Sequence, residues 1–282
     1  MKILVSINNK KQIDSYKKMG ALAFIFGLEK FSTTENSFSI EEIKELVKDD
    51  IEVFVSINKM FFNDELEELK TTLIDLSKLN IKGILFYDLS ILELVKELNL
   101  NIDLVWANTH MVTNYNTCNY YHEKGVKYAV LSSEITLEEM IEIKNKSDII
   151  PMLQLIMHPV MAHSKRTLLT NYYESNNKKY DNNTHTIIND DISCLIKENE
   201  YGTVILNKEI QNGTSVIKEL IDNNFPYVII NDEEIEEDIF NKLIELTHNL
   251  INNYNEDILK EIEDLIGNNT VFFFKKTIYK VK

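Results

Sequence analysis

Eight short apolar runs recur along the chain and alternate with segments of helical periodicity. This alternation limits the fold more than any other feature. Most of the runs are unbroken hydrophobic stretches rather than alternations of apolar and polar residues. Unbroken runs are typical of strands that are covered on both faces, as in a parallel sheet. The eight expected strands cover residues 3–6, 22–26, 52–57, 83–87, 103–107, 127–131, 150–156 and 227–230.

The segments between these runs carry the stripes and capping signals of amphipathic helices. Residues 40–47 repeat isoleucine, leucine and valine on one helical face. Residues 63–79 open with an Asn-Asp capping signal before leucines at helical spacing. Thr136, followed three residues later by Glu139, has the pattern of a capping box. Further helices are expected at 215–221, 234–250 and 257–266.

Eight strand-then-helix units within 282 residues match the count of a (β/α)8 TIM barrel. An open doubly wound sheet is the main alternative, but no glycine-rich phosphate loop follows any expected strand, which weakens its dinucleotide-binding form. We therefore expect one α/β domain over residues 1–282 that is TIM-barrel-like, with a C-terminal helix and tail at 256–282. Residues 271–282 are expected to form a strand on the barrel surface.

The connection between the seventh and eighth runs departs from the regular strand–helix alternation, because about 70 residues separate them. Its stretch 171–191 is polar and rich in asparagine, which is also compatible with a disordered linker. Strand character returns at 192–196 and 203–206, with Gly202 as a turn residue. We expect a β-hairpin excursion over 157–210 that covers the barrel mouth, where a long loop is usually functional.

The amino-acid composition limits which partners the protein can bind and in which cellular compartment it is expected. Forty-five acidic against thirty basic residues leave a net charge of −15, which disfavours direct contact with nucleic acid. The two cysteines, Cys118 and Cys194, are too few for a disulfide framework or a four-thiolate metal site. The apolar run at the start is too short for a signal peptide, and no stretch is long enough to span a membrane. These features predict a cytoplasmic protein.

Arg166 is the only arginine among the thirty basic residues. The abundance of Asn, Ile and Lys indicates a codon bias that replaces arginine by lysine. An arginine retained under that bias points to a place where lysine cannot substitute, such as a bidentate contact with a carboxylate or phosphate. The alternative is a surface arginine without function.

Active sites of TIM barrels lie where strands end and the following loops begin. The polar residues at those positions include Asn58, Asp88, Asn108, His110 and Glu134. Polar residues at strand ends also cap helices, and capping is the competing role for Asp88 and, further along, for Asn114 and Thr136. Asn108 and His110 follow the buried run that contains the only tryptophan.

The segment 157–173 is the strongest candidate for a functional site. Two histidines, a serine, a lysine and the lone arginine fall within nine of its residues. A serine nucleophile is conceivable from Ser164 with His163 or His110, but no G-x-S-x-G elbow is present. The spacing of the two histidines does not match a helical zinc site, so we expect no metal. An anion site formed by Lys165 and Arg166 fits better. The alternative is that these two residues begin a helix with a leucine core.

Several stretches of the chain are distinctive when taken together. They are GALAFIFGLEKFS (20–32), VFVSINKMFFNDELEEL (53–69), GILFYDLSILEL (83–94), the region 107–140, HSKRTLLTNYYE (163–174), YGTVILN (201–207) and KKTIYKVK (275–282). On these residues the chain resembles the collagenase-like peptidase U-32 family, and within it a short, single-domain subgroup of low-GC bacteria. The resemblance covers nearly the whole chain.

The resemblance implies a barrel fold and, by name, a peptidase. Better-understood relatives act in prephenate-dependent hydroxylation of wobble uridine in tRNA or in oxygen-independent ubiquinone hydroxylation. Their cysteines after strand seven hold an iron–sulfur cluster, whereas this chain has Val160 and Thr167 at about those positions. Ser133 stands where many relatives have an arginine. Because a cluster needs about four thiolates, we expect no iron–sulfur cofactor in this chain.

These observations support three hypotheses. In the first, the chain is an accessory or small-ligand-binding subunit in tRNA uridine hydroxylation, paired with a cluster-bearing paralogue. In the second it is a peptidase, and in the third a non-catalytic structural partner of a paralogue with a large exposed apolar patch. For the first, the expected residues that bind a small anionic ligand are Arg166, Lys165, His163, Ser164, Asn108, His110, Asp88, Glu134 and Asn58.

Overall fold

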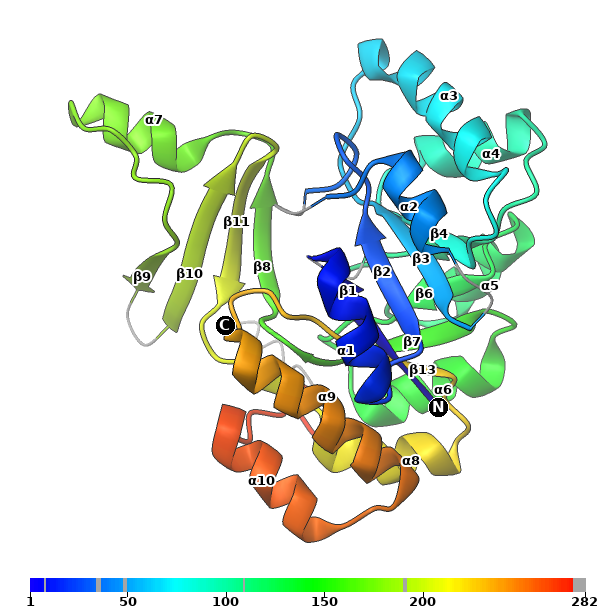
Figure 1. Ribbon diagram of the computed structural model, residues 1–282, viewed down its shortest axis with the longest axis vertical. Helices are drawn as coiled ribbons and strands as arrows, with labels where there is room; N and C mark the ends of the chain where they lie inside the picture. Colours follow the sequence, from blue (N-terminus) through cyan, green and yellow to red (C-terminus); the bar gives the residue numbers. More distant parts are fainter. Residues whose placement is uncertain (8, 34–36, 48–49, 109, 190–191, 276–282) are drawn as a thin grey trace, which may run out of the picture.

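Eight parallel strands close into a barrel in the computed structural model, which describes residues 1–7, 9–33, 37–47, 50–108, 110–189 and 192–275 (Figure 1). Each strand pairs with the next along the chain, and the last pairs back with the first. This confirms the expected (β/α)8 architecture. The barrel strands are β1 (Lys2–Ile7), β2 (Ala23–Gly27), β3 (Glu52–Ile57), β4 (Gly83–Phe86), β5 (Leu104–Trp106), β6 (Tyr128–Val130), β7 (Ile150–Met157) and β13 (Tyr227–Ile230).

Helices follow the strands on the outside of the barrel. They are α1 (Ile13–Lys18), α2 (Ile40–Leu46), α3 (Leu66–Leu76), α4 (Ser90–Glu97), α5 (Tyr115–Glu123), α6 (Leu137–Lys146), α8 (Ile217–Asp222), α9 (Glu237–Asn252) and α10 (Glu256–Ile266). Short 3-10 turns precede three of them, η1 (Lys10–Gln12), η2 (Asn63–Glu65) and η3 (Thr214–Val216).

The local capping signals decide where several helices begin. The Thr136–Glu139 capping box is present at α6, as expected. The Asn-Asp capping signal expected at residue 63 is wrong, because Asn63 lies inside η2 and α3 starts a turn later. There the Glu65 carboxylate accepts the backbone N–H of Phe62 at 2.7 Å.

The amino-terminal end of the barrel is closed by aromatic side chains. The Phe54 ring lies edge-on to Tyr128 and Tyr227, with ring centroids 5.9 and 5.8 Å away. The hydroxyl of Tyr227 donates to Glu52 at 2.7 Å, and Lys2 pairs with the same carboxylate. These contacts form a packed floor, so any space inside the barrel opens only toward the carboxyl ends of the strands.

The long connection after β7 forms a separate antiparallel sheet, which we call the roof sheet, in the order β8-β11-β10-β9. The expected hairpin is present as β10 and β11, and Gly202 at its turn has φ +134°, a conformation that favours glycine. The disordered-linker alternative is wrong for the described residues. The elements are β8 (Val160–Ser164), α7 (Leu168–Ser175), β9 (His185–Asn189), β10 (Ile192–Asn199) and β11 (Gly202–Asn207), and β12 (Gln211–Asn212) then returns to β7.

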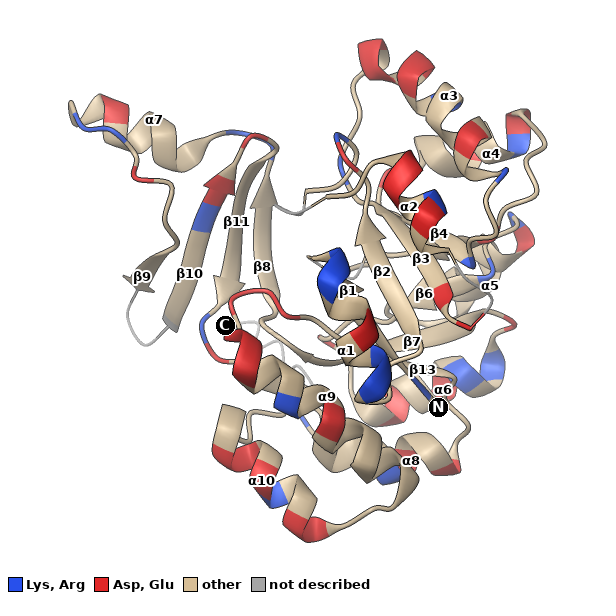
Figure 2. Cartoon of the chain, viewed as in Figure 1, with Lys and Arg blue, Asp and Glu red and all other residues tan. Residues whose placement is uncertain are grey.

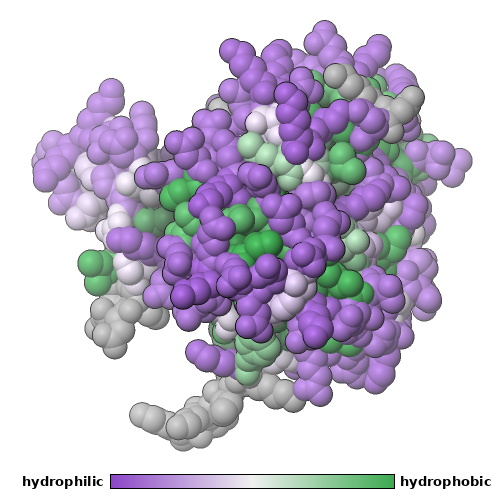
Figure 3. All heavy atoms as spheres, turned by 60° about the horizontal axis from the view of Figure 1, so that its bottom comes forward, coloured by the Kyte–Doolittle hydropathy of each residue, from purple (hydrophilic) through white to green (hydrophobic). Residues whose placement is uncertain are grey.

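The end of the chain differs from the expectation. Residues 271–274 form turns rather than a strand, and Phe273 packs into the core while its carbonyl accepts the N–H of Leu137 at 3.0 Å. Residues 276–282 lie outside the described part. On the face shown in Figure 3, hydrophobic residues lie in separate patches among hydrophilic ones. Within the described residues, no helix is long and apolar enough to cross a membrane.

Candidate functional site

A cavity of about 260 Å³ lies between the carboxyl ends of the barrel strands and the roof sheet. Its apolar walls inside the barrel are Ile25, Leu85, Val130 and Ile229. The roof contributes a cross-strand row of three neighbours on β8, β11 and β10, namely His163, Val204 and Lys197. The position is the one at which TIM barrels hold their ligands.

A layer of polar side chains separates the apolar interior from the roof. Ser6, Ser56, Gln154 and Asn231 line the cavity from β1, β3, β7 and the end of β13. Sequence reasoning missed these residues. The signal was a serine that interrupts two similar apolar runs, VSI at 5–7 and again at 55–57. Because side chains alternate along a strand, each serine points into the barrel at its upper layer.

Two asparagines at strand ends present oriented amides to the cavity. Asn58 Oδ1 accepts the backbone N–H of Thr33 at 2.8 Å and lies 3.1 Å from the Ser32 hydroxyl. Asn231 Oδ1 accepts the N–H of Glu233 at 2.9 Å. These contacts orient the NH2 group of each side chain as a potential donor to a ligand. The rim therefore offers two amide donors.

The charged groups in the cavity wall tie the roof sheet to the barrel. The Lys197 ammonium lies 2.8 Å from Glu233 and 3.3 Å from Glu234, both in the loop after β13. Asn199 adds a hydrogen bond of 3.0 Å to the carbonyl of Thr33. His163 lies at the cavity wall with an exposed side chain, and partial desolvation of its ring lowers its pKa. At neutral pH, His163 is therefore an uncharged donor or acceptor.

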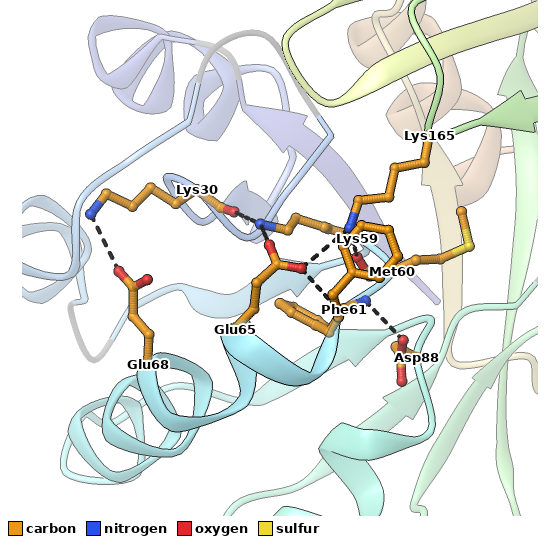
Figure 4. Close-up of polar contacts among 9 residues, drawn as sticks. Lys30, Lys59, Met60, Phe61, Glu65, Glu68, Asp88 and Lys165 are labelled. Carbon is orange, nitrogen blue, oxygen red and sulfur yellow. Dashed lines mark hydrogen bonds and ion pairs between the residues drawn. The ribbon is translucent and has the colours of Figure 1, made fainter.

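Lys165 fastens the roof sheet to the loop after β3 (Figure 4). Its ammonium lies 3.1 Å from the carbonyl of Met60 and 3.2 Å from Glu65 Oε2, above the ring of Phe62. Lys59 binds the other oxygen of Glu65 at 2.6 Å. The arrangement makes Glu65 the centre of a clamp between two loops.

Glu65 should give this clamp a measurable acid dependence. Desolvation would raise the pKa of Glu65, but hydrogen bonds from Lys59, the Phe62 N–H and Lys165 outweigh it and lower the pKa to about 2. The stabilisation is thus complete above the unfolded-state pKa near 4.3 and is lost as the pH falls toward 2. We expect Glu65→Gln to lose about 1–2 kcal/mol at pH 7, allowing for solvent screening.

Urea unfolding of Glu65→Gln and of the unchanged protein between pH 7 and the lowest pH at which both stay folded tests this expectation. The difference between the two should shrink as the pH falls below 4. Glu68→Gln, which removes a carboxylate paired only at the exposed surface with Lys30, is the matched control. A difference that stays constant with pH would contradict the role of Glu65.

Of the nine candidate residues, the structure brings Asn58, His110 and His163 to the cavity wall. Arg166 has an exposed side chain in the turn before α7, and its backbone N–H donates to the Ser164 hydroxyl at 3.2 Å. Among the described residues, Ser164 makes no hydrogen bond to a histidine. The anion-binding role expected of Lys165 and Arg166 and the peptidase hypothesis stay predictions.

The remaining candidates have local structural partners. Asp88 accepts the N–H groups of Ser90 at 2.9 Å and Phe61 at 3.0 Å, so it braces two loops (Figure 4). Asn108 accepts the N–H of Met111 through its carbonyl, and Glu134 lies 3.6 Å from His110 Nδ1. The competing capping role is confirmed for Asn114 at α5 and for Thr136 at α6.

The donor set does not fit an iron–sulfur cluster. Cys118 is buried in α5, where burial raises the pKa of its thiol to about 11, and Cys194 lies on β10 in the roof sheet. Within the described ranges, no three His, Cys, Asp or Glu side chains are grouped so that they could hold a metal ion. Val160 and Thr167, at about the positions of the relatives' cysteines, lie in the roof sheet and at the start of α7.

Comparison with known proteins finds similarity over nearly the whole chain. The model of the peptidase family U32 matches residues 8–276. The chain belongs to peptidase family U32. It is 28% identical over 98% of its length to tRNA hydroxylation protein P2 of Bacillus subtilis (strain 168), of which it covers 98%. It is also 26% identical to tRNA hydroxylation protein P1 of the same organism, over 60% of this chain and 42% of that protein.

Solved structures support the same fold. The U32 peptidase Mk0906 aligns with a TM-score of 0.52 at 14% identity, covering 82% of this chain and 92% of that one. A dihydrodipicolinate synthase aligns with a TM-score of 0.51 at 9% identity, over 94% and 79% of the two chains. At these identities the likeness concerns the barrel alone. The resemblance to the U32 family is confirmed by the family model.

Proposed function

We propose that this chain is a small-ligand-binding, accessory subunit of tRNA uridine hydroxylation in the cytoplasm. The full-length similarity to tRNA hydroxylation protein P2 supports the pathway. The weaker similarity to protein P1, which is more than twice as long as the matched region, supports a division of labour between two paralogues. In this proposal the partner is a cluster-bearing paralogue that supplies the redox chemistry, because the cysteines of this chain do not fit a cluster.

The ligand in this proposal is a small carboxylate such as prephenate, held in the cavity beneath the roof sheet. The single observation that carries the proposal is the pair of rim amides, Asn58 and Asn231. Each amide oxygen accepts a backbone N–H group, which orients the NH2 group of the side chain as a donor. The neutral His163 adds a further group that can donate a hydrogen bond at the roof. Hydrogen bonds from such groups to a carboxylate are strong.

In this proposal, Lys165 and Arg166 do not form the binding site for the ligand. Lys165 holds the roof sheet through Glu65, so its charge is already neutralised. Arg166 is exposed beside that clamp. The cavity, rather than this pair, provides the enclosed surroundings in which a small molecule can be held on several sides.

Deletion of the gene, followed by mass spectrometry of tRNA nucleosides, tests the proposed function. We expect hydroxylated uridine to disappear or fall several-fold, and a plasmid copy of the unchanged gene to restore it. Other modified nucleosides in the same digest serve as the internal control. Unchanged hydroxyuridine in the deletion strain would overturn the assignment to this pathway.

A further inference from the structure

One segment next to the roof sheet carries more bases than acids, although the chain as a whole is acidic. Residues 165–179, which we call the α7 arm, contain four of the thirty lysines and arginines and a single acid, Glu174. Figure 2 shows blue at both ends of α7, whereas red predominates on α10. Arg166 lies at the start of the arm, and Lys178 and Lys179 lie at its far end with exposed side chains. The net charge of −15 therefore hides a local reversal of sign.

The arm also presents an aromatic ring between its charges. Tyr172 is 64% exposed and Leu168, one turn earlier on the same face, is 40% exposed. The remaining positions of this face are Asn171 and Ser175, which are polar but uncharged. An exposed ring on a helix with basic residues at both ends suits single-stranded nucleic acid, which is bound through base stacking and phosphate contacts.

The arm is held firmly by the roof sheet. The carboxylate of Glu198, on β10, accepts the backbone N–H of Leu169 at 2.6 Å and of Thr170 at 3.1 Å, which caps the first turn of α7. Leu169 is buried against the roof sheet, and Tyr173 packs against Tyr180 with ring centroids 5.7 Å apart. Tyr172 is thus exposed because the inner face of α7 is packed and its outer face is turned to solvent.

We propose that the α7 arm binds a single RNA strand, with a base stacked on Tyr172 and phosphates near Arg166, Lys178 and Lys179. The inference rests on the proposed function, which makes RNA the substrate. The net charge of −15 makes contact with phosphates unfavourable over much of the remaining surface. A splayed single strand fits better than a duplex, because only unpaired bases can stack on a side chain. Glu198, which caps α7, also lines the cavity, so the arm and the cavity are adjacent.

Fluorescence anisotropy with a fluorescein-labelled RNA hairpin that has an unpaired loop tests this proposal. We expect Tyr172→Ala to weaken binding roughly 5- to 100-fold and Tyr172→Phe to retain it. Replacing both Lys178 and Lys179 by alanine should weaken binding and make it less dependent on salt, by about 0.7 in the log–log slope per lost phosphate contact. A fully paired RNA of the same length should bind less well than the hairpin.

Matched substitutions elsewhere separate this site from a general effect. Tyr120→Ala removes a tyrosine that is also exposed on a helix, at 56%, and replacing Lys10 and Lys11 by alanine removes the same charge. Both controls should bind the hairpin like the unchanged protein. The proposal is overturned if the arm variants bind the hairpin normally, or if they lose only an interaction with a protein partner. Neither outcome affects the deletion experiment, which can support the proposed pathway independently.

Discussion

Asn58→Asp should lower the affinity for prephenate about 10- to 100-fold in isothermal titration calorimetry. The aspartate keeps an oxygen to accept the N–H of Thr33 and the hydroxyl of Ser32, so the loop stays in place. It replaces the only donor of the side chain by a second, negatively charged oxygen. The loss of a hydrogen bond to a carboxylate, about 1.5–3 kcal/mol, accounts for this change, and repulsion adds to it.

The same exchange at Asn114 is the matched control. Asn114 Oδ1 accepts the N–H of Thr117 at 2.9 Å as the cap of α5, outside the cavity wall. Aspartate is a favourable residue at this position, so Asn114→Asp should bind prephenate like the unchanged protein. Asn231→Asp should repeat the loss seen at Asn58. If Asn58→Asp and Asn231→Asp both bound prephenate as tightly as Asn114→Asp and the unchanged protein, the rim amides would not hold the ligand.

Phe54→Ala should reduce the free energy of unfolding by about 3–5 kcal/mol, the largest effect on stability that we expect. Phe54 is fully buried at the floor of the barrel, where its ring contacts Tyr128 and Tyr227 edge-on. Alanine would leave a cavity among strands that are fixed by their hydrogen-bonded ladders, so the surroundings can close only partly. Urea unfolding followed by circular dichroism measures the change in midpoint.

Phe274→Ala serves as the control because that ring is 62% exposed. Its substitution should change the free energy of unfolding by no more than about 0.5 kcal/mol. If Phe54→Ala were no more harmful than this control, the aromatic floor would not contribute to the stability of the barrel.

The barrel was predictable because its strands are buried on both faces. Such strands read as unbroken apolar runs, and the expected ranges 52–57 and 227–230 coincide with β3 and β13. The capping box at Thr136 was equally local, since it needs only two residues three positions apart. Both features depend only on a short stretch of sequence, which is why they were found from the sequence.

The roof sheet was predicted only in part because its stability comes from distant partners. Strand β8 has mainly exposed or half-buried side chains and gains its register from β11, about forty residues later. The clamp of Lys165 joins residues 100 positions apart, and Glu198 caps a helix that precedes it in the chain. No local pattern encodes such pairs, so the clamp of Lys165 could not be found from the sequence.

Net charge is a limited guide for a related reason. The value of −15 sums over the whole chain and disfavours contact with nucleic acid unless the fold presents a basic face, and binding depends on where the charges lie. The α7 arm became visible only when the structure showed which side of α7 is packed and which is exposed.

Complementation of the deletion strain by the double variant Asn58→Asp, Asn231→Asp tests the central claim most directly. The claim is that the cavity beneath the roof sheet binds a ligand that tRNA hydroxylation requires. Mass spectrometry of tRNA nucleosides should show hydroxyuridine restored by the unchanged gene and by Asn114→Asp, but not by the double variant present at equal protein level. Full restoration by the double variant would contradict the claim and favour a purely structural role for the chain.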